Sequence, residues 1–369
     1  MRETELNMKN NNLRLRILSV GHYLPSHTRT NDWWPSSIVE KWAGQPRTER
    51  NEDRPRAAET ELTEGNRKTI QAMANYQDDP FRGAKERRVM DESMHPSDME
   101  TAAAQTAIKM ANVSNQKIDF ILSHSVRPDF LNTPNACAVH AKLGLPKTCF
   151  SLSIDGMCNA FLLQLHLANQ LIANGTHKYG LLVQSSNLTS MAPSDAPYSA
   201  WFGDGATAVV VAGDPNDGLL GECHLTDSSL NNALVFGVPG KQWHEEGRIF
   251  TYPENNDRAK RMLLSVADFG AEVVHGALAA ANIPAESVDY YACHQAAPWM
   301  RELTREHIGL THAQSVDTFT WAGSLSAANI PLALAIGSQE GTLKNGDIVA
   351  MYAGGSGITY SGIVQRWRT

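Results

Sequence analysis

Apolar runs of strand length alternate with helical patterns along almost the whole chain. The expected strands cover residues 13–25, 117–126, 148–154, 178–187, 205–213 and 288–296, and we expect those between 117 and 213 to be buried. Residues 346–367 are expected to form a pair of strands joined by a glycine turn. The expected helices cover residues 97–113, 133–145, 159–175, 260–283, 297–310 and 324–343, the last with Pro331 inside it. Such alternation predicts an α/β fold built of packed layers. Because the rhythm restarts near residues 213–218, we expect two halves, residues 1–215 and 216–369.

The composition narrows the class of protein. The chain has 369 residues, 42% of them hydrophobic, which is enough for a large core. Its formal net charge of −7 argues against a nucleic-acid surface, because such surfaces cluster Lys and Arg. No signal peptide and no apolar segment of membrane-spanning length is apparent, so we expect a cytoplasmic protein without a membrane partner.

The five cysteines are widely spaced and form no C-x-x-C pair. This pattern is typical of reduced thiols in a cytoplasmic protein and predicts neither a disulfide framework nor a metal site.

Residues 31–80 interrupt the regular pattern with a polar, charge-rich segment. We interpret it as an insertion of surface helices and loop after the first strand. The insertion either extends into solvent or covers a functional site. Trp33, Trp34 and Trp42 within it could cap a substrate entrance or pack against a partner subunit.

Cys158 lies in "SIDGMCNAF", between an expected strand and an apolar helix. Two interpretations remain open. A buried cysteine commonly acts as a small hydrophobe. Alternatively, the free N–H groups and positive end of the following helix would stabilise a thiolate and lower its pKa.

His294 follows the strand in "YYACHQAAP", at the carboxyl end where α/β layers commonly carry reacting groups. A lone histidine is more often structural, but a reactive thiol needs a proton partner of this kind. The glycine-rich turn "YAGGSGITY" could present backbone N–H groups to a substrate.

Five segments in order carry a resemblance to a known family: "SIDGMCNAF", "WFGDGATAVVV", "YYACHQAAP", "AGSLSAANIPLAL" and "YAGGSGITYSG". Together with "GAKERRV" at residues 83–89, they resemble the ketoacyl synthase III (3-oxoacyl-ACP synthase III) family of condensing enzymes. The resemblance covers nearly the whole chain. It implies the thiolase fold, two duplicated halves in a five-layered α-β-α-β-α sandwich, and a homodimer.

The resemblance also implies roles for individual residues. Cys158 matches the nucleophile that accepts an acyl group from a thioester, and His294 matches the catalytic histidine. The backbone N–H groups of Cys158 and Ser356 match the oxyanion hole. Asp204 matches a structural position in a tight turn. The donor would be an acyl-CoA or an acyl carrier protein, and no permanently bound cofactor or metal is implied.

The chain departs from the family pattern at the third catalytic position, where the family has asparagine in "GNTSAASIP" and this chain has Ser324. We do not expect Asn329 to substitute for it, because it lies five residues further along an expected helix and points elsewhere. Serine offers one rotatable hydroxyl in place of a rigid amide donor. The family's coenzyme A-binding tryptophan and arginine are also absent. Phe81 and Arg82 stand near that position, where Phe81 could stack on the adenine and Arg82 could contact a phosphate; otherwise the donor is bound to a carrier protein.

These departures favour an acyltransferase that passes its acyl group, without decarboxylation, to an oxygen, nitrogen or carbon nucleophile in specialised-metabolite biosynthesis. The alternative is a decarboxylative synthase that condenses an acyl thioester with a malonyl thioester and tolerates serine. A third hypothesis is a non-catalytic partner subunit. Such subunits typically lose the nucleophile, whereas this chain keeps Cys158 and His294.

Overall fold

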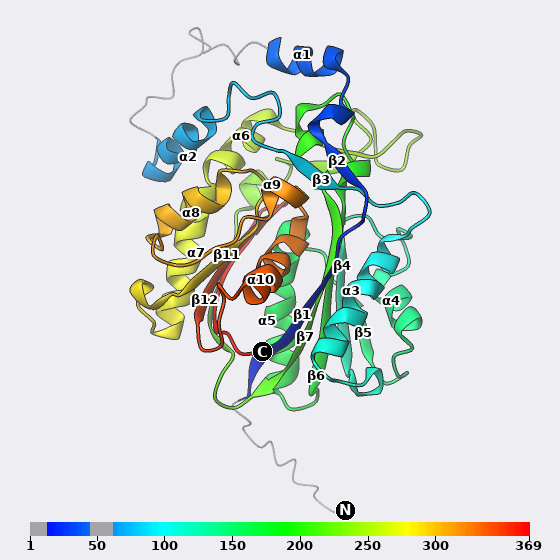
Figure 1. Ribbon diagram of the computed structural model, residues 1–369, viewed down its shortest axis with the longest axis vertical. Helices are drawn as coiled ribbons and strands as arrows, with labels where there is room; N and C mark the ends of the chain where they lie inside the picture. Colours follow the sequence, from blue (N-terminus) through cyan, green and yellow to red (C-terminus); the bar gives the residue numbers. More distant parts are fainter. Residues whose placement is uncertain (1–12, 45–61) are drawn as a thin grey trace, which may run out of the picture.

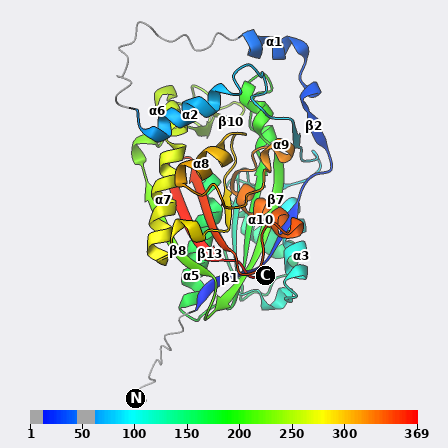
Figure 2. The same ribbon diagram turned by 60° about the vertical axis from the view of Figure 1, so that its left-hand side comes forward.

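The computed structural model describes residues 13–44 and 62–369, and their helices and strands form five layers. From left to right, Figure 1 shows outer helices, a sheet, two middle helices, a second sheet and further outer helices. The turned view in Figure 2 keeps the same layers. The α/β prediction is therefore confirmed.

The first sheet has the strand order β1-β7-β6-β4-β5. Its strands are β1 Arg14–Tyr23, β4 Phe120–Ser125, β5 Phe150–Ser153, β6 Tyr179–Asn187 and β7 Asp204–Asp214. We expected β5 to be buried, and this is wrong. Among the strands that the structure describes it pairs only with β4, so it forms an edge of the sheet and leaves Phe150 and Leu152 exposed.

The second sheet has the order β11-β12-β13-β8. Its strands are β8 Leu219–Thr226, β11 Tyr290–Cys293, β12 Ile348–Gly355 and β13 Thr359–Arg366. β12 and β13 form the expected pair around a glycine turn. Two short pairs lie outside the main sheets: β2 Thr28–Thr30 with β3 Glu86–Arg88, and β9 Val235–Gly237 with β10 Phe250–Tyr252.

Two helices, α5 Ala160–Ala173 and α10 Asn329–Glu340, fill the space between the sheets. Their apolar side chains form one core with the inner faces of both sheets, including Leu162 and Leu165 of α5 and Ile330 and Leu334 of α10. We expected a longer helix interrupted by Pro331. The helix instead begins at Asn329, so Pro331 lies in the first turn, where its missing N–H leaves no hydrogen bond unmade.

The outer helices cover the other faces of the sheets. α3 Pro96–Met110 and α4 Asn135–Leu143 pack on the first sheet, and α7 Val266–Ala281 and α8 Met300–Ile308 on the second. The short 3-10 helices are η1 Asn31–Trp33, η3 Asn115–Lys117, η4 Met157–Asn159, η5 Leu188–Ser190, η6 Pro197–Trp201, η7 Ser228–Leu230, η8 Ala285–Ser287 and η9 Ser326–Ala328.

The single helix expected over residues 260–283 is instead two helices, α6 Asn256–Leu264 and α7, bent by 50° at Ser265. The Leu264 carbonyl accepts hydrogen bonds from the side chains of Asn66 and Thr69 of α2 Glu64–Ala74. These partners allow the chain to turn, because the carbonyl is satisfied from outside its own helix. Among the described residues, no single helix is long and apolar enough to cross a membrane; only the bent α6–α7 pair together passes on length and composition.

The insertion at residues 31–80 contributes η1, α1 Ser36–Gly44 and α2, and its residues 45–61 lie outside the described part. Trp34 and Trp42 are buried and form an aromatic cluster with Phe81, whose ring centroid lies 5.7 Å from each of theirs. Trp33 alone of the three tryptophans is exposed, and Arg29 lies over its ring. Trp34 and Trp42 therefore pack within their own chain and are not free to form a cap or a subunit contact.

β7 ends at Asp214 and β8 begins at Leu219, on either side of the proposed boundary between residues 215 and 216. The division into two halves remains a prediction.

Candidate functional site

Cys158, His294, Ser324 and Ser356 line one cavity, although they come from four distant segments. The remaining lining is largely apolar: Met157, Leu188, Phe202, Leu234, Phe236, Thr251, Met262, Leu263, Val266, Phe269, Ala296, Met300, Ser326, Tyr352, Gly354, Gly355 and Ile358. The described lining includes no Asp, Glu, Lys, Arg, Asn or Gln. Such a lining suits an uncharged, apolar group.

Cys158 is half-buried in η4, two residues before α5 begins, so it lies beside the N-terminus of a helix as predicted. The preceding residue, Met157, has a φ of 49°, a left-handed conformation that is strained for a side chain of this size. Gly355 of the glycine-rich turn packs against the backbone around Cys158, between Gly156 and Asn159. A Cβ at Gly355 would lie 2.3 Å from the Gly156 carbonyl oxygen, so only glycine lets the two segments approach.

His294 directly follows β11, and its backbone N–H donates to the Tyr352 carbonyl of β12 at 3.0 Å. Its ring Nδ1 lies 3.2 Å from the Ser326 carbonyl oxygen and 3.1 Å from Asn329 Oδ1. A carbonyl oxygen can only accept, so Nδ1 carries a hydrogen. In the neutral ring the lone pair is then on Nε2, the nitrogen left to interact with Cys158.

The Asn329 carboxamide is held in a single orientation. Its Oδ1 also accepts the Leu325 backbone N–H at 3.0 Å, which identifies this atom as oxygen and not nitrogen. Asn329 is fully buried, and it acts on the far side of the imidazole ring from Cys158. Our premise of a continuous helix from Ser324 to Asn329 is wrong, because residues 326–328 form η9. Asn329 does not line the cavity, and that it does not substitute for a donor at position 324 remains a prediction. It positions His294, a role that sequence analysis missed.

The pKa values of Cys158 and His294 shift toward each other. Burial raises the pKa of the Cys158 thiol, but the positive charge of His294 and hydrogen bonds from His294 and Ser326 outweigh it and hold the pKa below its ordinary value. Burial lowers the pKa of His294, but the Cys158 thiolate and the hydrogen bond to Asn329 raise it overall. Both shifts ease transfer of the thiol proton from Cys158 to His294.

Ser326 was also missed by sequence analysis. Its hydroxyl donates to Cys158 Sγ at 3.4 Å, and its backbone has a φ of 52°. The left-handed conformation, unusual outside glycine, lets one residue offer its hydroxyl to the sulfur while its carbonyl accepts from His294. Ser324, two residues earlier in the chain, is buried. Its backbone N–H donates to the Trp201 carbonyl at 2.7 Å.

The other predicted site residues lie apart from this cavity or have a structural environment. The ring of Phe81 is engaged by Trp34 and Trp42, and Arg82 is exposed; neither lines the cavity. Their role in thioester binding stays a prediction. Asp204 is buried, and its carboxylate accepts from the backbone N–H groups of Met90 and Thr189, in keeping with a structural role.

Comparisons with known proteins identify the class. Two family models match, 3-oxoacyl-[acyl-carrier-protein (ACP)] synthase III over residues 152–228 and its C-terminal domain over residues 278–367. The fold is that of the thiolase-fold condensing enzymes, which transfer acyl groups. A β-ketoacyl-[acyl-carrier-protein] synthase III of Microcystis aeruginosa is 31% identical over 292 residues, covering 77% of this chain and 87% of that protein. The chain therefore belongs to the ketoacyl synthase III family.

Solved structures agree on the fold. The synthase III of Aquifex aeolicus superposes with a TM-score of 0.75 at 25% identity, covering 96% of this chain and 100% of that one. The enzyme of Pseudomonas aeruginosa gives 0.76 at 21% identity, with 96% and 99% covered. OleA of Xanthomonas campestris, solved with lauric acid and lauroyl-CoA bound, gives 0.73 at 19% identity, with 96% and 99% covered.

Replacing Asn329 tests its action on His294. In Asn329→Leu the imidazolium loses an acceptor of Nδ1–H, so we expect the pKa of His294 to fall and that of Cys158 to rise. Alkylation of Cys158 by iodoacetamide at pH 7 should slow about tenfold, equivalent to one pKa unit, and its pH midpoint should move upward. The rate is measured by intact mass across a pH series.

Asn329→Asp is the matched control, because a carboxylate keeps the acceptor and should preserve rapid alkylation. A Leu variant with an unchanged pH profile but a lower melting temperature would assign Asn329 a purely structural role.

Proposed function

We propose that this protein is an acyltransferase that takes an acyl group from a CoA or carrier-protein thioester onto Cys158. It then transfers the group without decarboxylation to an oxygen, nitrogen or carbon nucleophile in specialised-metabolite biosynthesis. The observation that carries the proposal is the set of donors at the cavity: His294 and the Ser324 hydroxyl, with no amide side chain among the described lining.

The first half-reaction needs a thiolate and an oxyanion hole. His294 Nε2 accepts the thiol proton, and Cys158 Sγ attacks the thioester carbonyl carbon. The backbone N–H groups of Cys158 and Ser356 are proposed to stabilise the oxyanion, a donor being worth about 3 kcal/mol of barrier. The carbon–sulfur bond of the donor then breaks, and the imidazolium protonates the leaving thiolate.

In the second half-reaction His294 removes a proton from the acceptor, which attacks the acyl carbon bound to Cys158. The bond to Sγ breaks and the thiolate is restored beside the imidazolium. Cys158, His294 and the proposed oxyanion hole serve both half-reactions. This sequence requires no donor at Ser324, which is why a serine is compatible with it.

Decarboxylation makes a different demand. Loss of carbon dioxide from a malonyl thioester leaves an enolate, whose oxygen needs rigid donors placed in advance. Asn329 does not supply the second donor, because its side chain does not line the cavity. A rotatable hydroxyl at Ser324 is the weaker replacement.

The decarboxylative alternative is favoured by one finding: the curated relatives are β-ketoacyl-[acyl-carrier-protein] synthases. We expect Ser324→Asn to increase carbon dioxide release from malonyl thioesters at least tenfold, because it restores an amide donor beside His294. Labelled malonyl-CoA and malonyl carrier protein serve as substrates, and the released carbon dioxide is measured.

Ser324→Ala is the control and should give no such gain. Comparable decarboxylation by the wild-type protein and the Ser324→Asn variant would contradict the acyl-transfer proposal and favour the synthase.

We also propose a homodimer joined at β5. Among the described strands β5 pairs with β4 alone, which leaves one side of its backbone unpaired, and its residues Phe150 and Leu152 are 45% and 41% exposed. An exposed apolar edge of this kind is a surface on which a second copy can add its own strand. The carrier protein is the other proposed partner.

Phe150→Glu combined with Leu152→Lys should shift the protein from dimer to monomer in sedimentation velocity at micromolar concentration, because charges would be buried in the contact. Ile70→Glu on α2 is the control, since Ile70 is equally exposed at 45%. A wild-type monomer, or equal dissociation of the control, would refute the β5 contact.

A further inference from the structure

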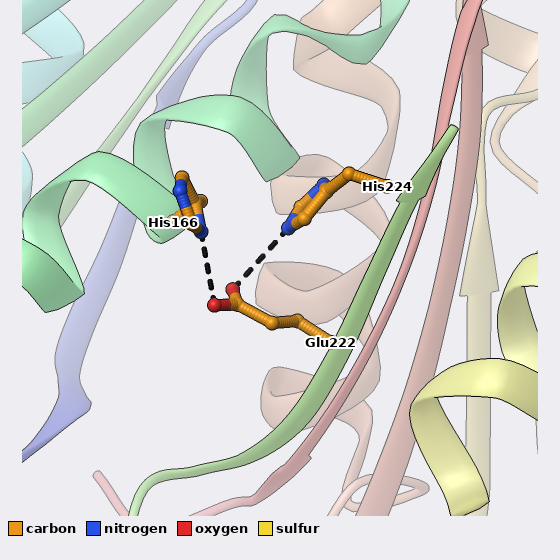
Figure 3. Close-up of side chains that lie close together, drawn as sticks. All are labelled: His166, Glu222 and His224. Carbon is orange, nitrogen blue, oxygen red and sulfur yellow. Dashed lines mark hydrogen bonds and ion pairs between the residues drawn. The ribbon is translucent and has the colours of Figure 1, made fainter. Parts of the chain in front are cut away.

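Three side chains from α5 and β8 meet beside the middle layer. His166 comes from α5, and Glu222 and His224 lie two residues apart on β8, so both point to the same face of that strand (Figure 3). His166 Nδ1 is 2.9 Å from Glu222 Oε1, and His224 Nε2 is 3.3 Å from Oε2. The two rings lie edge to face with centroids 4.8 Å apart. The three side chains therefore direct two imidazole nitrogens and a carboxylate at one point.

The chemistry of these atoms selects a class of ion. Two imidazole nitrogens with one carboxylate suit Zn²⁺ and related transition metals, whereas Mg²⁺ and Ca²⁺ prefer oxygen ligands alone. Around a tetrahedral zinc with bonds near 2.0–2.1 Å, ligand atoms lie about 3.3 Å apart. All three ligand atoms already lie within 4.8 Å of one another, so side-chain movements of about 1.5 Å bring them to that spacing.

The burial of the group also fits an ion. The side chains of His166, Glu222 and His224 are 37%, 22% and 25% exposed, which leaves room for water as a fourth ligand. Within residues 13–44 and 62–369, this is the one group of three His, Cys, Asp or Glu side chains close enough to share an ion.

His224 is oriented by a further contact on its other ring nitrogen. His224 Nδ1 lies 2.8 Å from the Ser361 hydroxyl oxygen, which also accepts a hydrogen bond from Asn159 Nδ2 at 2.9 Å. Histidines that bind metals are typically held by a polar group at the second nitrogen in this way. Ser361 leaves Nε2 directed at Glu222, and Asn159 directly follows Cys158 in the chain.

We propose that His166, Glu222 and His224 form a zinc-binding site that joins α5 to β8. The ion would replace the two hydrogen bonds between the histidines and the carboxylate and would fix the relative position of the two elements. The sequence analysis expected no metal site from the spacing of the cysteines and did not consider these residues, because 55 residues separate His166 from Glu222 and the three form no compact ligand motif.

Zinc titration of the metal-free protein tests this. All proteins carry Cys158→Ala, so that the reactive thiol cannot bind the ion. Isothermal calorimetry should give one Zn²⁺ per chain with micromolar or tighter affinity, and the melting temperature should rise with zinc. Co²⁺ should give visible bands of a site with nitrogen and oxygen ligands, without a sulfur charge-transfer band.

Glu222→Gln and His166→Gln keep size and hydrogen-bonding groups but remove a ligand, so each should weaken zinc binding by more than about 100-fold. Ser361→Ala should weaken it about 10–100-fold. His312→Ala, an exposed histidine elsewhere, should leave it unchanged. Variants are compared without metal by circular dichroism to establish that they fold.

Absence of stoichiometric binding by the Cys158→Ala protein would overturn the proposal and leave the three residues as a hydrogen-bonded group. Equal binding by well-folded Glu222→Gln and Cys158→Ala proteins would overturn it as well, because the ion would then lie elsewhere.

Discussion

The packing of two helices between the sheets determines where the site can form. α5 begins two residues after Cys158, and α10 begins three residues after Ser326, so both middle helices begin just after a residue that lines the cavity. One apolar core holds them against both sheets and thereby fixes the thiol relative to the histidine and its partner. The N-terminus of α5 also adds a positive potential that favours a thiolate.

A buried thiolate and imidazolium are stable only as a pair. Either charge alone would be costly in an apolar cavity, since desolvation disfavours both. The opposite charge and the hydrogen bonds from Ser326 and to Asn329 outweigh that cost. Strained backbone at Met157 and Ser326 lies on both sides of the sulfur, where the surrounding core can hold it.

Local patterns predicted most of the elements, because each strand and helix carries its own periodicity. They failed where distant residues decide. β5 was read as buried from its apolar residues, although only strand order makes it an edge. The break at Ser265 depends on Asn66 and Thr69, almost two hundred residues away in the chain.

The same contrast between local patterns and contacts of distant residues holds for the site. Cys158, His294 and Ser324 were found from ordered motifs, and they do line one cavity. Asn329 was considered only as a replacement at Ser324, since no sequence pattern tells that its oxygen meets His294 Nδ1. Intact mass spectrometry after incubation with acyl-CoA and acyl carrier protein donors tests the central claim. We expect one acyl adduct per chain, located on Cys158 by peptide mapping and absent in Cys158→Ala. No adduct with any donor would contradict it and favour a non-catalytic subunit.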